Sequence, residues 1–198
     1  MAAAGILPSN ARKPKPETDP MISNDMAALI GEQIDRELYS ANFYLSLSAH
    51  ADDMDLKGTA AWFLAKNKEE TTHALKMFRY LMDQDATLTL GALPAPESVE
   101  DGVLPIFERT LEHERKVTAW INDMVDRALK EKDHATGIFL QWFVTEQIEE
   151  EATVKDIIGR LRRFGDHGHS LLMIDNELAA LAGKMGKGAT DAAADAAA

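Results

Sequence analysis

The sequence contains no cysteine among its 198 residues. This absence excludes disulfides, thiolate zinc sites, cysteine-held iron–sulfur clusters, rubredoxin-type iron and a thiol nucleophile. No stretch approaches the roughly 20 consecutive apolar residues that a membrane-spanning helix needs. The apolar part of the N-terminus is too short for a secretion signal, and its basic residues follow it instead of preceding it. We therefore expect a cytoplasmic protein with no membrane partner.

Basic residues are also scarce, since 21 Lys and Arg stand against 33 Asp and Glu and the formal net charge is −12. Such an acidic chain is a poor candidate for binding nucleic acid and a plausible one for attracting cations. Hydrophobic residues make up 45% of the chain, which is typical of a globular domain. The length predicts one domain with a sizeable core.

Proline is confined to two short regions, which divide the chain; it occurs at positions 8, 14, 16, 20, 94, 96 and 105. Because proline breaks helix interiors, long helices are expected only in the two tracts that lie outside these regions. We interpret residues 1–20 as a flexible arm and residues 21–184 as a single domain. The Ala/Asp-rich residues 185–198 are expected to form a disordered tail.

Within both tracts the apolar residues recur with a helical period, and no strand pattern is present. We predict four long helices, at about 23–51, 59–85, 103–130 and 133–164, and a shorter fifth between Ser170 and Gly183. The breaks after the first and third helices are short, which makes those helices antiparallel to the next. The break at about 86–102 can span a whole helix. The predicted fold is therefore all-α, a four-helix bundle with one long crossover and a short fifth C-terminal helix.

Each long helix places a glutamate inside its apolar arc when its residues are set at about 100° intervals. These glutamates are Glu37, Glu70, Glu114 and Glu150, with Glu146 and Gln147 flanking the last of them. The arcs consist of Ile30, Ile34, Leu38, Ala41, Tyr44 and Leu45; Phe63, Ala74, Met77, Phe78 and Leu81; Phe107, Val117, Ile121, Val125 and Ala128; and Phe139, Phe143, Val154, Ile157 and Leu161.

One inward glutamate could be a satisfied structural residue, but four uncompensated carboxylates would cost several kcal/mol each and repel one another. We expect no lysine or arginine centrally on the same arcs, because Arg109, Lys116 and Arg127 lie on the opposite side of their helix. A metal is then the remaining counter-charge. His73, three residues after Glu70, favours iron or manganese, then zinc, over calcium.

The chain from about residue 22 to 183 resembles a bacterial non-haem ferritin, a member of the ferritin-like di-iron family. The resemblance is carried by Glu37-Leu38-Tyr39-Ser40, by Glu69-Glu70-Thr71-Thr72-His73, by Glu114, and by the run from Phe139 to Glu150, FLQWFVTEQIEE. A pair of glutamate ligands with Glu-x-x-His is the di-iron pattern of such bundles.

The resemblance implies the roles of these residues. Glu37, Glu70 and His73 would hold a first iron, and Glu70 would bridge to a second iron held by Glu114 and Glu150. Gln147 stands where bacterioferritins have a carboxylate, and Glu150 where they have a histidine, so the two positions should differ in strength. Tyr44 matches the family's site tyrosine.

A third iron position is implied at Glu69, Glu146, Glu149 and Glu150, although Glu149 and Glu151 also fit a solvated acidic face. Thr71 occupies the place of the haem-ligating methionine of bacterioferritins, so no haem is expected. Trp142 is interpreted as a core or interface residue. The five other histidines are expected on the surface or in loops, namely His50, His113, His134, His167 and His169.

The function implied is iron storage with ferroxidase activity. Fe²⁺ would be oxidised at the di-iron centre by O₂ or hydrogen peroxide and stored as Fe³⁺ mineral inside a cage of 24 subunits. Two alternatives are a peroxide-using di-iron enzyme, which the lack of cysteine disfavours, and a non-catalytic mineral-nucleating scaffold, which would lack some of the four ligands Glu37, Glu70, His73 and Glu114.

Overall fold

The structure, a computed structural model, describes residues 21–99, 102–165 and 167–195, with side chains to residue 185. Over these ranges it contains five α-helices and no strand, which confirms the all-α class. No helix within the described part of the chain is both long and apolar enough to cross a bilayer. The predicted N-terminal arm, residues 1–20, lies outside the described residues.

The four long helices begin and end within about two residues of the predicted positions. They are α1 (Asn24–Asp53), α2 (Lys57–Asp83), α3 (Val103–Glu131) and α4 (His134–Phe164). Ser23 caps α1 by accepting a hydrogen bond from the backbone N–H of Met26 at 3.0 Å. Asp133 caps α4 in the same way through the N–H of Thr136 at 3.0 Å. Local capping chemistry therefore fixes two of the boundaries.

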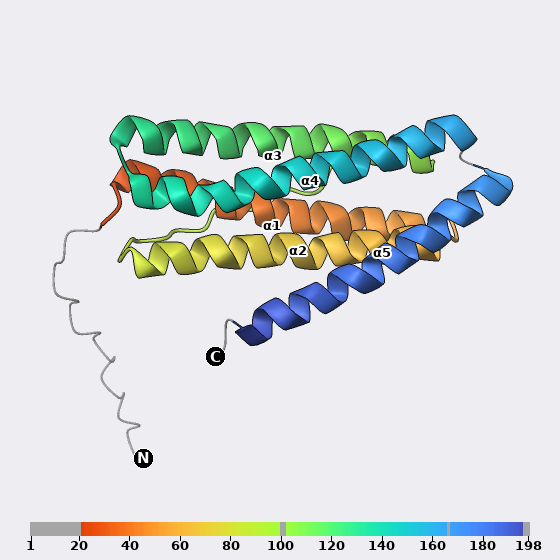
Figure 1. Cartoon of the computed structure of the whole chain (residues 1–198), viewed down its shortest axis with the longest axis horizontal. Coiled ribbons are helices and arrows are strands. Elements are labelled where there is room, and N and C mark those ends of the chain that lie inside the picture. Colours follow the sequence, from red (N-terminus) through yellow and green to blue (C-terminus); the bar gives the residue numbers. More distant parts are fainter. Residues whose placement is uncertain (1–20, 100–101, 166, 196–198) are drawn as a thin grey trace, which may run out of the picture.

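The connections give the predicted topology. Short turns join α1 to α2 and α3 to α4, so each of these pairs is antiparallel. The segment after α2 runs back along the bundle, and α3 therefore starts at the same end as α2 and lies parallel to it (Figure 1). Asp55 and Lys132, in the two short turns, have positive φ values of 61° and 59°.

The fifth helix differs from the prediction. Helix α5 (Gly168–Asp195) does not stop at Gly183, and its backbone is helical where a disordered tail was expected from residue 185. Each interior glycine costs only about 1 kcal/mol relative to alanine, so Gly183 is a weak stop signal, and the helix continues through Gly186 and Gly188 into a run rich in alanine, the strongest helix former. Helix α5 folds back along α2 at the edge of the bundle (Figure 1).

The core consists of two apolar clusters, one toward each end of the bundle. The first contains Ile30, Met77, Ile121 and Leu140, and the second contains Phe63, Phe107, Ile157 and the α5 residue Leu178. The buried polar side chains described below come from helix positions between these clusters. The apolar ends thus hold four helices together around a polar middle layer.

Two residues assigned to the apolar arcs are in fact largely exposed, Leu45 at 48% and Phe78 at 40%. Each directly follows a residue that is fully buried, Tyr44 and Met77 respectively. Neighbouring side chains on a helix point about 100° apart, so only one residue of each pair lies on the buried face of its helix.

Candidate metal centre

All four inward glutamates are buried, with exposed fractions of 1% for Glu37, 4% for Glu70, 2% for Glu114 and 8% for Glu150. Each comes from a different helix of the bundle, α1 to α4. His73, Tyr44 and Gln147, the other predicted central residues, are also buried. The structure therefore brings the whole predicted central set into the polar middle layer.

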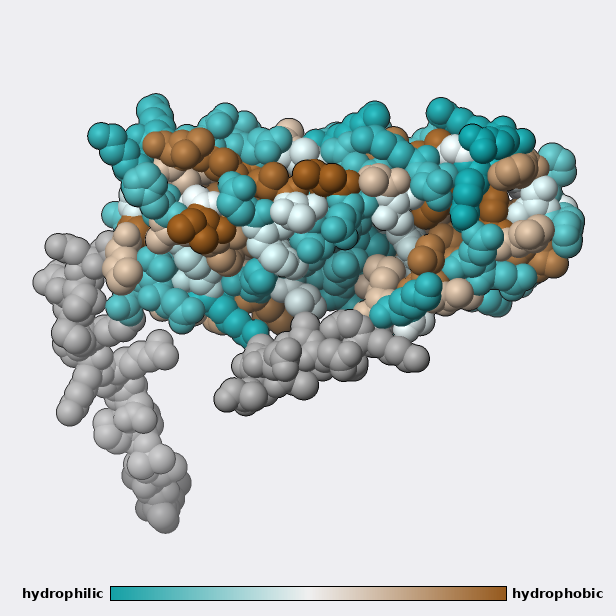
Figure 2. Space-filling model, in the orientation of Figure 1, coloured by the Kyte–Doolittle hydropathy of each residue, from teal (hydrophilic) through white to brown (hydrophobic). Residues whose placement is uncertain are grey.

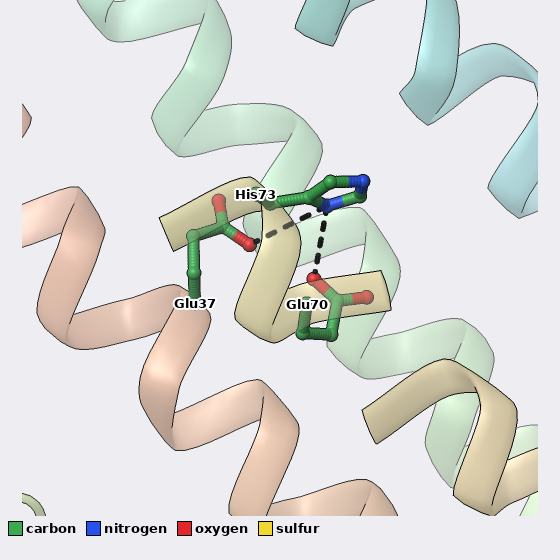
Figure 3. Close-up of side chains that lie close together, drawn as sticks. All are labelled: Glu37, Glu70 and His73. Carbon is green, nitrogen blue, oxygen red and sulfur yellow. Dashed lines mark hydrogen bonds and ion pairs between the residues drawn. The ribbon is translucent and has the colours of Figure 1, made fainter. Parts of the chain in front are cut away.

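Glu37, Glu70 and His73 lie close together (Figure 3). One ligand atom from each lies within 4.8 Å of the others. Nδ1 of His73 is 3.2 Å from Oε2 of Glu70 and 4.0 Å from Oε2 of Glu37. The i, i+3 spacing on α2 places Glu70 and His73 on one face, and α1 brings Glu37 opposite them.

The electrostatics of this group are those of a buried ion pair beside a third carboxyl. Burial alone would raise the pKa of Glu70, but the charge and hydrogen bond of His73, with help from Lys66, lower it to about 2. Burial alone would lower the pKa of His73, but Glu70 and Glu37 raise it to about 9. The pKa of Glu37 is raised well above its usual value by burial and by the charge of Glu70.

The surroundings of Oε2 of Glu37 give the most direct structural evidence for a metal site. This oxygen is buried and has no hydrogen-bond partner among the described residues, while Oε1 accepts from Nε2 of Gln33 at 2.8 Å. A buried carboxylate oxygen without a donor is costly, and a cation coordinated there would satisfy it. Two carboxylates and one imidazole are a donor set that suits Fe²⁺, Mn²⁺ or Zn²⁺.

Glu114 lies on the other side of the layer, held by two neutral donors. Tyr44 donates from its hydroxyl to Oε1, and Nε2 of Gln147 donates to Oε2 at 3.1 Å. Burial is the largest influence on Glu114, followed by the charge of Glu70, and both raise its pKa. Burial and the neighbouring carboxylates also raise the pKa of Tyr44 well above its usual value. Tyr44 therefore stays a hydrogen-bond donor.

Lys66 corrects the expectation that no basic side chain reaches this layer. Its ammonium donates to Oε1 of Glu150 and to Oε2 of Glu69, the latter at 2.7 Å, and the residue is only 1% exposed. Burial acts to lower its pKa, but Glu150, Glu69 and Glu70 raise it well above the usual value. Lys66 and the charged His73 thus compensate part of the inward negative charge, so the prediction that only a metal could do so is wrong.

Sequence spacing could have found Lys66, because it precedes Glu70 by four residues and so lies one turn away on the same face. Gln33, which was also missed, precedes Glu37 by the same interval. Its side chain is completely buried and bonded to that glutamate. A polar residue one turn before an inward glutamate is therefore a sequence signal for a buried polar partner.

The residues of the predicted third position are brought together only in part. Glu69, His73 and Glu146 have ligand atoms within 4.8 Å of one another. Glu149 is exposed, but it lines a pocket together with Glu69, Glu146 and Glu150. Burial raises the pKa of Glu146. Burial also raises the pKa of Glu150, to about 8, despite the opposing charge of Lys66.

His113 was expected at the surface and is instead 7% exposed. Its Nε2 lies 2.8 Å from Oγ of Ser40, and its ring packs 4.9 Å from that of Phe43. Burial lowers its pKa to about 4, so it is neutral and serves as a packed polar residue. His113 was not predicted to be buried because Glu114, the next residue, lies at the centre of the apolar arc, and neighbouring side chains on a helix point about 100° apart.

The remaining histidines are not in the layer. His134, His167 and His169 are exposed as predicted, and His50 is half-buried at the end of α1. Trp142 is 37% exposed and packs edge-on against His73 at 5.3 Å, with the Lys76 ammonium 4.1 Å from its ring centre.

A helical bundle with one long crossover and a buried carboxylate–histidine cluster defines a class of proteins that bind metal between facing helices. A family model described as a ferritin-like domain matches residues 27–164. The chain therefore belongs to the ferritin family, which confirms the resemblance seen in the sequence.

Individual relatives agree. The chain is 39% identical to a bacterial non-heme ferritin of Campylobacter jejuni over 155 residues, which cover 78% of this chain and 93% of the relative. It is 35% identical to a probable bacterial non-heme ferritin-like protein of Haemophilus influenzae, over 83% and 99% of the two chains. An open pore ferritin from Archaeoglobus fulgidus has a TM-score of 0.78 and 42% identity, covering 80% of this chain and 98% of that one.

Proposed function

We propose that this protein stores iron and is a ferroxidase. Fe²⁺ binds as substrate in the middle layer, is oxidised there by O₂ or hydrogen peroxide, and is kept as Fe³⁺ mineral inside a cage of 24 subunits. The single observation that carries the proposal is the Glu37–Glu70–His73 group, in which the buried Oε2 of Glu37 accepts no hydrogen bond within the described part of the chain. Membership of the ferritin family supports it, as do relatives named as non-heme ferritins.

The proposed first position uses Glu37, Glu70 and His73, and the second uses Glu70, Glu114 and Glu150. Tyr44 and Gln147 orient Glu114 through their hydrogen bonds. Two Fe²⁺ ions together supply two electrons, enough to reduce O₂ to hydrogen peroxide with two protons, or hydrogen peroxide to water. Glu37 and Glu114, whose pKa values are raised, would release protons when cations bind.

The proposed third position lies beside the first, on the side of Glu69, Glu146 and Glu149. It shares His73 with the first position in the geometry described above, and Glu150 with the second. An acidic pocket next to an oxidation centre would suit the transfer of Fe³⁺ out of it, because hard carboxylate oxygens hold such ions. The cytoplasmic location expected from the sequence stays a prediction.

Stopped-flow oxidation of the metal-stripped, assembled protein tests the proposal. Protein mixed anaerobically with Fe²⁺ is exposed to O₂, and the appearance of Fe³⁺ absorbance is followed. We expect Glu37→Gln to slow the fast phase at least about tenfold, because even partners of metal ligands commonly contribute that much. The matched control is Glu32→Gln, an exposed glutamate on the same helix with a side chain 61% exposed. Equal rates for wild type and Glu37→Gln would contradict the proposal.

A further inference from the structure

Lys66 is the buried charge that the proposed reaction does not use. Its side chain is 2% exposed, and its ammonium faces carboxylates from two helices: Glu69 and Glu70 on α2 and Glu150 on α4. From α1 the Tyr44 ring lies 6.0 Å away. A lysine is rarely buried unless its charge is paired, and here it is paired with more than one carboxylate.

The ammonium contacts one half of the middle layer and leaves the other half free. It lies 3.8 Å from Oε1 of Glu70, whereas His73 contacts Oε2 of the same carboxylate at 3.2 Å. Neither Glu37 nor His73 is an ion-pair partner of Lys66 in the described part of the chain. Lys66 therefore contacts Glu70 and Glu150, which belong to the proposed second position, and neither of the residues that belong to the first position alone.

We propose that Lys66 is a tethered cation that takes the place of a metal at the second position, so that the two positions bind metal with unequal affinity. This inference rests on the proposed function of the same site. The Lys66 ammonium already contacts both Glu70 and Glu150, so a divalent ion held by these two carboxylates would lie next to it. Two neighbouring positive charges repel strongly in a buried site. The first position, on the other side of Glu70, binds without displacing Lys66.

Lys66 also donates hydrogen bonds to Glu69 and Glu150, two residues of the proposed third position, and so competes with an ion for their oxygens. A route for its displacement exists beside it. Lys66 lines the pocket that contains Glu146 and Glu149, so a rotated side chain would find other carboxylates there. Lys66 is thus a positioning residue whose movement accompanies the loading of the second ion.

Calorimetric titration with Zn²⁺ alone tests this inference without any redox step. The metal-stripped, assembled full chain is titrated at neutral pH as wild type, Lys66→Met and Lys68→Met. Methionine keeps the length and the apolar stem of lysine, and exposed Lys68 is the matched control on the same helix. For wild type and the control we expect one tight ion per subunit and a second bound at least about tenfold more weakly. Lys66→Met should tighten the second ion at least about tenfold and leave the first within about twofold.

The wild-type titration can overturn the inference even if Lys66→Met does not assemble. Two equally tight ions in wild type would overturn the inference while leaving the proposed function intact. An unchanged or weaker second ion in assembled Lys66→Met would also overturn it, since a purely structural ion pair predicts that result. No tight ion in either protein would instead overturn the proposed function.

Discussion

At the scale of single residues, the middle layer balances its charges with internal partners. His73 pairs with Glu70, and Lys66 pairs with Glu150 and Glu69. Glu37 and Glu114 have raised pKa values because they are buried beside other carboxylates. The metal-free protein therefore folds with a nearly neutral site in which protons and two basic side chains occupy the place of metal charge.

The His73–Glu70 pair makes the stability of the metal-free protein depend on pH. The pKa of His73 is raised to about 9, so its contribution is fully present below the unfolded value near 6.5 and is lost as pH rises through 9. The pKa of Glu70 is lowered to about 2, so its contribution is present above about 4.5 and is lost as pH falls through 2. Between about pH 4.5 and 6.5 both contribute.

We therefore expect His73→Ala to destabilise the chelator-treated protein most at pH 6, by up to about 3 kcal/mol, and much less at pH 10. Melting temperatures of wild type and variant across this range measure the difference. His134→Ala, at an exposed position, is the control and should change little at any pH. A difference that stays constant from pH 6 to 10 would show that His73 is not paired as a cation.

The central residues could be predicted because a glutamate inside an apolar arc is conspicuous in a sequence. Lys66 and Gln33 were not predicted, although each lies one turn before an inward glutamate on the same helix face, because polar residues on an apolar arc were considered only when they were acidic or could bind metal. The burial of His113 depends on packing by Phe43 and on the hydroxyl of Ser40, a residue 73 positions away in the sequence. Contacts of that range have no local signature.

At the scale of elements, helix boundaries follow caps and prolines, and those were predictable from the sequence. The end of α5 was not, because alanine-rich sequence is compatible with a helix as well as with disorder. The packing of α5 against α2 could not be predicted from the sequence either. It depends on Gly58, where an added Cβ would lie only 1.8 Å from the backbone oxygen of Asp175.

Asp175 of α5 caps the start of α2, which has no side-chain cap of its own at Leu56. Its carboxylate accepts from the backbone N–H of Gly58 at 3.0 Å and of Thr59 at 2.7 Å, and from the Thr59 hydroxyl at 2.8 Å. The negative charge also lies at the positive end of the helix dipole.

We expect Asp175→Ala to cost about 1–2 kcal/mol of stability and to speed hydrogen exchange in the first turn of α2. Exposed Asn176, the next residue, supplies the control variant Asn176→Ala. The exchange of amides near Glu70 should not change, because the bundle core is unaltered. Unaltered exchange at Gly58 and Thr59 in Asp175→Ala would refute the capping role.

At the scale of the whole molecule, the isolated subunit leaves large apolar side chains uncovered. Ile138 and Ile148 on α4 are 75% and 67% exposed, and Leu129 on α3 is 65% exposed. Brown, hydrophobic residues interrupt the hydrophilic surface over α3 and α4 (Figure 2). Exposed apolar side chains in such number suit a subunit that packs against other copies.

A 24-subunit cage of 21.8-kDa chains predicts an assembly of about half a megadalton. Light scattering coupled to gel filtration of the full chain measures this mass directly. A discrete dimer would favour a soluble di-iron enzyme, and a monomer would leave the exposed side chains of α4 unexplained. Either result would contradict the storage cage while leaving the metal centre open to test.

Glu37, Glu70 and His73 are the residues that we propose bind iron. The most direct test is anomalous X-ray diffraction from crystals of the assembled protein soaked anaerobically in Fe²⁺. We expect an iron peak within coordination distance of Nδ1 of His73 and of one oxygen each of Glu37 and Glu70. The absence of iron between these residues, with His73 still hydrogen-bonded to Glu70 as described above, would refute this role.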